Sequence, residues 1–343
     1  MQNRSRAAVL GHGLLGHGLL GLGLLGLGLL GLTAAGLVPF AAQGQTPGSG
    51  PSIKLIVPYA AGGLPDTVAR VVGRRLQERM GQTVVIENRG GANGGIGMAA
   101  LVGAPADGQT FVVSDGSMLS TNPLLYAKLP YDPKDIAPVA FLAQAPLFLA
   151  VHPKLPVVTL KEFIDYVKAR PGQINYGSSG VGSIHHISME GVKVSLNLAM
   201  THIPFKGTGE SVPALLGGHV EALFSAYPSL SGAAGTNKIT LIATNGAGRS
   251  PLAPNVPAIA EIVPGFDLAT IVGIYARTGV PSAIIQKIAA EADEIVKEPE
   301  VIKQLAAVGI EAKGGGPAEF DRALKGEGER AGKVIKAAGI KAE

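Results

Sequence analysis

The stretch IVPYAAGGLPDTVARVV, residues 56–72, joins a strand pattern to a helix pattern and carries no catalytic motif at the joint. The run that leads into it, IKLIVPY, is short and mostly apolar, which is typical of a strand buried on both faces of a sheet. From Val68, apolar residues recur at helical intervals as far as Met80, and Gly81 ends the pattern. This order predicts a strand–loop–helix unit of an α/β fold.

The residues at this joint predict a loop that binds an anion. In an open parallel sheet, ligands lie beyond the carboxyl ends of the strands, where loops lead into helices. Gly62 and Gly63 allow the backbone to approach a ligand closely, and Pro65 fits the first helical turn. Asp66 also lies in that turn, near the positive end of the helix dipole. Free amides at such a helix start favour an anion; the alternative is a plain glycine-rich turn.

The same alternation continues along the chain and predicts a second α/β unit. TVVIENR and GQTFVVSD read as further strands of the first unit, with the helix IGMAALVGA between them. In the second unit the helix TLKEFIDYVKAR has Thr159 as its cap, and another helix begins near Ser183. The remaining predicted elements are the strands INYGSS, MTHIPF, VEALFSA and ITLIATN, the helix GESVPALLGG, and two helical regions from residue 281 onward.

Two long extended stretches, near residues 140–152 and 267–280, predict crossings between the units. The chain would build most of one domain, cross to build the other, and then return. This places residues 51–147 and 270–343 in domain 1 and residues 148–269 in domain 2. Each lobe is expected to be a mainly parallel sheet flanked by helices, and proteins of this kind close over a ligand by a hinge.

The N-terminus predicts export. Arg4 and Arg6 precede a charge-free tract of glycine and leucine that runs to about Leu37, and VPFAAQGQTPGSG follows with small residues. These are the three parts of a signal peptide, expected over residues 1–43 with cleavage near Ala42–Gly44, so the mature protein would be periplasmic. The apolar tract is long for a signal peptide, so an uncleaved anchor is the alternative.

Composition excludes several classes of function. The chain has 343 residues and no cysteine, which rules out a disulfide framework, a thiolate metal site and cysteine catalysis. The formal charge is only +4, without a basic stripe, so no nucleic-acid partner is expected. No cofactor or metal is predicted.

Three further joints resemble the first in their chemistry. YGSSGVGSIHH and IPFKGTGES combine hydroxyls with glycines before a helix, and VSDGSMLSTNP places Ser117 at the end of a strand. Hydroxyls and amides without cations suit a carboxylate. Each joint alone could be a solvent-exposed turn, but four of them at the same edge of two sheets predict a shared cleft.

Catalytic and metal sites find less support. GSSGVG is neither a dinucleotide fingerprint nor a phosphate loop, and no serine lies in a Gly-x-Ser-x-Gly elbow. His186 and Glu190 are four residues apart and could share a metal ion, but a packing or capping role of the His185–His186 pair is favoured. Lys206 is a weak candidate for an anion partner. An exported hydrolase or lyase, with Asp66 or His185 as its general base, remains the alternative function.

In combination, the motifs resemble a known family. VPYAAGGLPDTVAR, VVIENRGGANGGIG, PADGQTFVVS, YGSSGVGSIHH, PFKGTGES and ALLGGHVEALF occur in the order found in receptors of the tripartite tricarboxylate transporter family, often called Bug receptors. The resemblance runs from about residue 53 to the C-terminus. It implies a two-lobed, type II-like periplasmic binding-protein fold and a receptor, not an enzyme. Such a receptor binds a small carboxylate and delivers it to membrane permease subunits, or signals to a sensor kinase; a monomer is expected.

The resemblance also implies which residues contact the ligand. Many relatives have Pro where Ala60 stands, which is a small change. Relatives often carry Asp or Asn in place of Ser225, at a position that tends to face the cleft, so the identity of the ligand stays open. The full predicted set is Tyr59, Ala60, Gly62, Gly63, Asp66, Ser117, Ser178, Ser179, Ser183, Gly207, Thr208 and Ser225.

Overall fold

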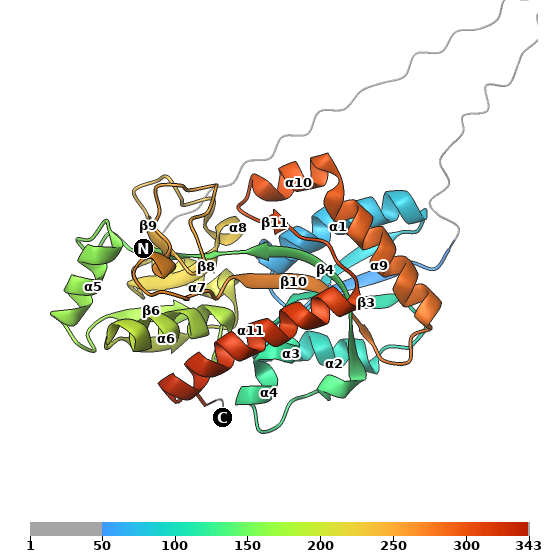
Figure 1. Ribbon diagram of the computed structural model, residues 1–343, viewed down its shortest axis with the longest axis horizontal. Helices are drawn as coiled ribbons and strands as arrows, with labels where there is room; N and C mark the ends of the chain where they lie inside the picture. Colours follow the sequence, from blue (N-terminus) through green and yellow to red (C-terminus); the bar gives the residue numbers. More distant parts are fainter. Residues whose placement is uncertain (1–49, 342–343) are drawn as a thin grey trace, which may run out of the picture. The chain divides into compact units, whose positions relative to one another are not determined.

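The computed structural model describes residues 50–341, and this part of the chain folds around two β-sheets flanked by helices (Figure 1). The predicted signal peptide and its cleavage site lie outside the described residues. Among residues 50–341, no helix combines the length and the apolar character needed to cross a bilayer.

The first sheet contains six strands in the order β11-β4-β10-β3-β1-β2. Its helices come from both ends of the described chain, because α1 to α4 precede the second sheet in sequence and α9 to α11 follow it (Figure 1). We call this sheet and its helices lobe 1. Its strands are β1 (Ile53–Val57), β2 (Val84–Asn88), β3 (Thr110–Asp115), β4 (Ile136–Ala145), β10 (Thr270–Arg277) and β11 (Glu311–Ala312). Its helices are α1 (Leu64–Met80), α2 (Gly95–Gly103), α3 (Ser117–Ser120), α4 (Asn122–Leu125), α9 (Ser282–Lys297), α10 (Pro299–Ala306) and α11 (Pro317–Ala338).

The second sheet contains five strands in the order β7-β6-β8-β5-β9, and we call it and its helices lobe 2. The strands are β5 (Leu147–Val151), β6 (Asn175–Ser178), β7 (Thr201–Pro204), β8 (Ala222–Ala226) and β9 (Thr240–Thr244). The helices are α5 (Leu160–Lys168), α6 (Ile184–Leu196), α7 (Thr208–Leu216) and α8 (Tyr227–Leu230). Three short 3-10 turns complete the elements, at Ala92–Gly94, Pro133–Asp135 and Ile259–Glu261.

Both sheets are mixed rather than mainly parallel. β1 pairs in parallel with β2 and β3, and β6 pairs in parallel with β7 and β8. The crossing strands run the other way: β10 is antiparallel to β3 and β4, and β5 is antiparallel to β8 and β9. The reason is topological, because each crossing strand enters its sheet from the neighbouring lobe and not through a helix on the same sheet.

The extended stretches are the places where the chain changes sheet. Only Pro146 separates β4 of the first sheet from β5 of the second, and β10 brings the chain back to the first sheet. The domain boundaries near residues 147 and 270 stay a prediction, which this division of the strands favours. The predicted helix from residue 281 divides into α9 and α10 at Pro299, because proline cannot donate the backbone hydrogen bond that a helix interior needs.

Local signals in the sequence explain the helices beside the cleft. Pro65 lies in the first turn of α1, and Gly81 ends the helix with φ +64°, a conformation that favours glycine. The Thr159 side chain accepts a hydrogen bond from the Glu162 amide at 3.2 Å, which confirms the predicted cap of α5. Ser183 caps α6 by accepting from the His186 amide at 3.3 Å.

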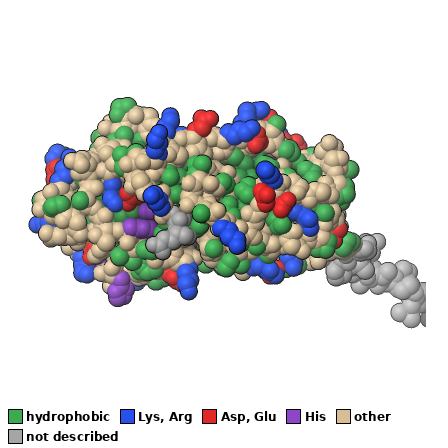
Figure 2. Space-filling view, turned by 90° about the horizontal axis from the view of Figure 1, so that it is seen from below, with side chains coloured by type: hydrophobic (Ala, Val, Ile, Leu, Met, Phe, Trp, Pro, Cys, Tyr) green, Lys and Arg blue, Asp and Glu red, His purple; other side chains and the backbone are tan. Residues whose placement is uncertain are grey.

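Helix α11 packs closely on the returning strand and reaches lobe 2. A β-carbon placed on Gly273 would lie 2.2 Å from the Phe320 ring, so only glycine allows this ring to lie against β10. Farther along the helix, the Arg330 Nε donates to the carbonyl of Asp267 at 2.9 Å, in the segment that precedes β10. On the face shown in Figure 2, basic and acidic side chains are interspersed.

Candidate functional site

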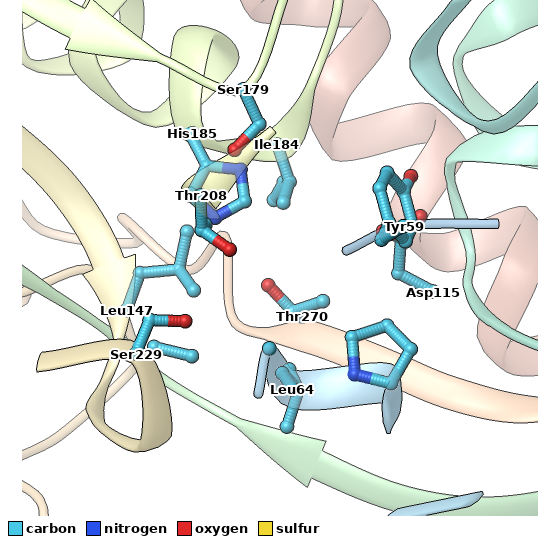
Figure 3. A pocket seen from close by; sticks show the side chains of 13 residues that line it. Tyr59, Leu64, Asp115, Leu147, Ser179, Ile184, His185, Thr208, Ser229 and Thr270 are labelled. Atoms are coloured by element: carbon cyan, nitrogen blue, oxygen red, sulfur yellow. The ribbon is translucent and has the colours of Figure 1, made fainter. Parts of the chain in front are cut away.

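A small enclosed cavity lies between the lobes, where several strand ends and helix starts meet (Figure 3). Its volume is about 30 Å³, which is small for a metabolite. Lobe 1 contributes the β1–α1 joint and the end of β3; lobe 2 contributes the β6–α6 joint and the starts of α7 and α8; both crossings also reach it. The lining residues are Tyr59, Gly63, Leu64, Pro65, Asp115, Leu147, Ser179, Ile184, His185, Thr208, Ala226, Ser229 and Thr270. A larger groove of about 500 Å³, between residues 246–252 and β11, contains none of the predicted residues.

The lobes meet around this cavity. The Tyr126 hydroxyl of lobe 1 donates to the Val181 carbonyl of lobe 2 at 2.9 Å. A β-carbon placed on Gly209 would lie only 3.2 Å from the Ala60 β-carbon, and one placed on Gly63 would lie 3.5 Å from the Thr208 Oγ1. The two lobes are therefore in contact around the cavity in this structure.

The structure brings part of the predicted set to the cavity: Tyr59, Gly63, Ser179 and Thr208 line it. Ala60, Gly62 and Gly207 are next to lining residues in the chain but are not among them. Ser225 is also absent from the lining, whereas its neighbour Ala226 is present, because successive side chains of a strand point to opposite faces of the sheet.

The most informative feature of the cavity is its set of unpartnered polar atoms. The hydroxyls of Ser179, Ser229 and Thr270 are buried and have no hydrogen-bond partner within the described part of the protein, and the same holds for Nδ1 of His185. Ser179 is 4% exposed and Thr270 is 2% exposed. A buried polar group without a partner costs ~1–3 kcal/mol. Such groups are therefore available to a bound ligand.

The electrostatics of the cavity are unusual for an anion site. No lysine or arginine occurs among the lining residues of the described chain. Burial lowers the pKa of His185 to about 4, so its ring is neutral near pH 7. Burial raises the pKa of Asp115, although its carboxylate accepts hydrogen bonds from the Ser117 and Tyr59 side chains and from the Ser117 amide, at 2.9 Å. The cavity thus places a few polar groups in a largely apolar lining, and any positive charge there must come from the ligand.

Asp66 does not line the cavity but holds the loop that does. Its carboxylate accepts hydrogen bonds from the Gly62 amide at 2.8 Å, from Arg70 at 2.9 Å and from Asn88 at 2.9 Å. Burial alone would raise the pKa of Asp66. The three hydrogen bonds and the charge of Arg70 together lower the pKa by more than burial raises it, so the net shift is downward. A direct contact between Asp66 and a ligand stays a prediction; the observed contacts position the β1–α1 joint.

Ser178, Ser183 and Ser117 also have partners inside the protein. Ser178 Oγ contacts His202 Nε2 at 2.6 Å, and Ser183 Oγ donates to the Gly180 carbonyl at 2.8 Å. Ser117 is buried at the start of α3 beside Asp115. These serines fix the loops around the cavity.

We expect Ser183→Ala to lower the free energy of unfolding by ~1 kcal/mol, because it removes the N-cap of α6. Urea titration followed by circular dichroism would measure this. Ligand affinity should change less than twofold in calorimetry. A large loss of affinity with unchanged stability would contradict the capping role and favour a direct ligand contact.

Sequence reasoning missed Asp115, Ser229 and Thr270. Each was visible as a polar residue next to a strand pattern: Asp115 ends VVSD, Ser229 follows the strand in SAYPSL, and Thr270 begins the apolar run TIVGIY. At the joint VSDGSMLSTNP the prediction named Ser117 and not Asp115, and Ser229 and Thr270 lie outside the four predicted joints.

His186 and Glu190, which share a helix face as the spacing indicates, are not part of a metal-binding cluster within the described residues. His186 and Glu190 lie 3.9 Å apart, but no group of three or more His, Cys, Asp or Glu residues within 50–341 could hold a metal ion. Instead, His186 stacks on His202 with the ring centroids 3.9 Å apart. His186 therefore has a packing role, as predicted.

Comparisons with known proteins agree with this geometry. The profile of the tripartite tricarboxylate transporter family receptor matches residues 68–340. Protein BugT of Bordetella pertussis is 34% identical over 260 residues, covering 75% of this chain and 80% of BugT. Among solved structures, R. palustris Rpa4515 with adipate is 33% identical with a TM-score of 0.82, covering 84% of this chain and 98% of that one.

Two other solved structures extend the comparison. MatC from Rhodopseudomonas palustris with bound malate is 28% identical with a TM-score of 0.76, over 83% of this chain and 98% of MatC. The periplasmic binding protein BugD is 25% identical with a TM-score of 0.79, over 85% and 99%. These matches confirm the resemblance seen in the motifs and the two-lobed binding-protein fold. The chain therefore belongs to the tripartite tricarboxylate transporter family of receptors.

Proposed function

We propose that this protein captures a small carboxylate between its lobes in the periplasm and delivers it to a tripartite tricarboxylate-type permease. The observation that carries the proposal is the cavity between the lobes, where the buried hydroxyls of Ser179, Ser229 and Thr270 have no hydrogen-bond partner among residues 50–341. Family membership and the adipate and malate held by two relatives support the ligand class.

Neutral groups are sufficient for such binding. A micromolar dissociation constant corresponds to about −8 kcal/mol. Each hydrogen bond to a charged group contributes ~1.5–3 kcal/mol. Three to five such bonds around a carboxylate reach this range after the cost of immobilising the ligand, without a lysine or arginine. A site of this kind also releases its ligand when the lobes separate and water returns to the carboxylate.

Isothermal titration calorimetry with adipate, malate, succinate and aspartate tests the proposal directly. We expect at least one of them to bind with a micromolar dissociation constant, and native mass spectrometry of the freshly purified protein should show a co-purified carboxylate. Small-angle scattering should show a smaller radius of gyration on saturation, because the ligand stabilises the closed state. Absence of binding across a broad carboxylate panel would contradict the proposal.

The same preparations separate a receptor from an exported hydrolase or lyase. An enzyme needs a general base at the ligand. His185 reaches the cavity, but Asp66 is engaged with Arg70, Asn88 and the Gly62 amide. A receptor returns the bound carboxylate unchanged after prolonged incubation, which NMR of the ligand would show. Conversion of the ligand would favour the enzyme.

A further inference from the structure

We propose that Asp115 makes this protein select carboxylates that also carry a hydrogen-bond donor, a hydroxyl or an ammonium group. This inference rests on the proposed function and identifies the ligand class more closely. It starts from an asymmetry of the cavity: one side presents a carboxylate, and the opposite side presents hydroxyls (Figure 3).

Asp115 is a buried acceptor that faces the ligand space. It ends β3, is 5% exposed and lines the cavity beside Tyr59 (Figure 3). Its carboxylate accepts from the Ser117 amide at 2.9 Å and from the side chains of Ser117 and Tyr59. A carboxylate has about four acceptor positions, so at least one remains. No lysine or arginine within residues 50–341 is an ion-pair partner of Asp115.

The opposite side has the complementary chemistry. Ser179, Thr208 and Ser229 lie across the cavity from Asp115, and Thr270 lies between the two sides (Figure 3). The hydroxyls of Ser179 and Thr270 have no hydrogen-bond partner in the described part of the chain, and both residues are more than nine-tenths buried. These hydroxyls can donate to a ligand carboxylate. A ligand that spans the cavity thus meets donors at one end and an acceptor at the other.

The acceptor side disfavours a second carboxylate. Glu327 lies directly behind it: a β-carbon on Gly116 would come within 1.8 Å of Glu327 Oε2. Burial raises the pKa of Glu327 to about 8, so near pH 7 this group is mostly neutral and offers no cation to a ligand carboxylate. Tyr59 and Tyr131 are the other ionisable groups next to Asp115. None of these is a cation. A ligand carboxylate beside Asp115 would meet like charge, whereas an ammonium or hydroxyl would form a charge-assisted hydrogen bond.

A matched set of ligands tests this inference on the purified full-length protein. Succinate, malate and aspartate share one carbon skeleton and differ by a hydrogen, a hydroxyl and an ammonium group; adipate is a longer acid without a donor. We expect malate or aspartate to bind the wild type at least tenfold more tightly than succinate or adipate. Asp115→Asn should weaken binding of the donor-bearing ligand at least tenfold, and it should leave the affinity for succinate unchanged or increase it. Asp165→Asn removes the same charge at an exposed position of α5 and should change neither.

The outcomes distinguish a failure of the selection by Asp115 from a failure of the proposed function. Binding of succinate or adipate by the wild type as tightly as malate and aspartate overturns the selection by Asp115 and leaves the proposed function intact. Equal affinity of Asp115→Asn and wild type for the donor-bearing ligand also overturns it. No binding of any carboxylate contradicts the proposed function itself. The wild-type preference is informative even if Asp115→Asn does not fold, which a thermal melt would show.

Discussion

Replacing Ser179 with alanine is expected to stabilise the ligand-free protein and to weaken carboxylate binding about 10- to 100-fold. The two effects have opposite signs because the hydroxyl is buried, with the residue 4% exposed, and has no hydrogen-bond partner among the residues that the structure describes. Removing it relieves a desolvation cost of about 1 kcal/mol in the empty protein. In the complex the substitution removes a hydrogen bond to the charged ligand. Such a bond contributes ~1.5–3 kcal/mol, which corresponds to the expected loss of affinity.

Ser225 provides a matched control for this prediction. Its hydroxyl is also buried without a hydrogen-bond partner within residues 50–341, but Ser225 does not line the cavity. Ser225→Ala should therefore also stabilise the protein while leaving calorimetric affinity unchanged. Thermal melts without ligand and titrations with the best-binding carboxylate would give both quantities for each variant. An equal loss of affinity in Ser179→Ala and Ser225→Ala, or a lower melting temperature of Ser179→Ala, would contradict the assignment.

Much of the fold could be predicted because its signals are local. The strand run before Tyr59, the Thr159 cap and the Ser183 helix start each depend on neighbours in the chain, and each appears where the patterns place it. Strand direction could not be predicted in the same way. β5 and β10 have the same apolar composition as parallel strands, and only their partners, distant in sequence, make them antiparallel.

The site was predictable at its glycine joints and less so elsewhere. Gly63 and Thr208 approach each other across the cleft from joints that the sequence marks clearly. Asp66 and Ser178 have side chains that could bind a ligand. In the structure, however, Asp66 accepts a hydrogen bond from Arg70, and Ser178 contacts His202. The sequence shows which side chains are able to bind an anion. The tertiary fold decides whether their hydrogen-bonding groups are already used by other residues of the protein.

Acid should destabilise the protein through two buried histidines behind the Ser178–Ser183 loop. Burial and the charge of Lys193 lower the pKa of His186 to about 4, and burial, with the charge of His186, lowers that of His202 to about 3. His186 Nδ1 accepts from the Gly182 amide at 3.1 Å, and His202 Nε2 contacts Ser178 Oγ at 2.6 Å. Because the two rings stack at 3.9 Å, protonating both would place two positive charges together.

The sign of the change in stability with pH follows from the number of protons bound in the folded and unfolded states. An unfolded histidine has a pKa near 6.5, so between pH 6.5 and 4 the unfolded state binds more protons than the folded one. The contribution of His186 to stability is thus complete above pH 6.5 and is lost as the pH falls toward 4. One pKa unit corresponds to about 1.4 kcal/mol, so His186 alone should account for about 3 kcal/mol. Glu327 acts in the opposite direction, because burial raises its pKa to about 8.

The difference in unfolding free energy between wild type and His186→Gln separates the contribution of His186 from that of Glu327, which both proteins share. In His186→Gln the amide oxygen can still accept from the Gly182 amide, but the side chain does not titrate. Urea unfolding at pH 7.5, 6.0 and 4.5 should show wild type losing about 2–3 kcal/mol relative to His186→Gln over this range. His219→Gln, at an exposed position, should follow the wild type. Parallel curves for wild type and His186→Gln would show that the buried histidine does not control stability in acid.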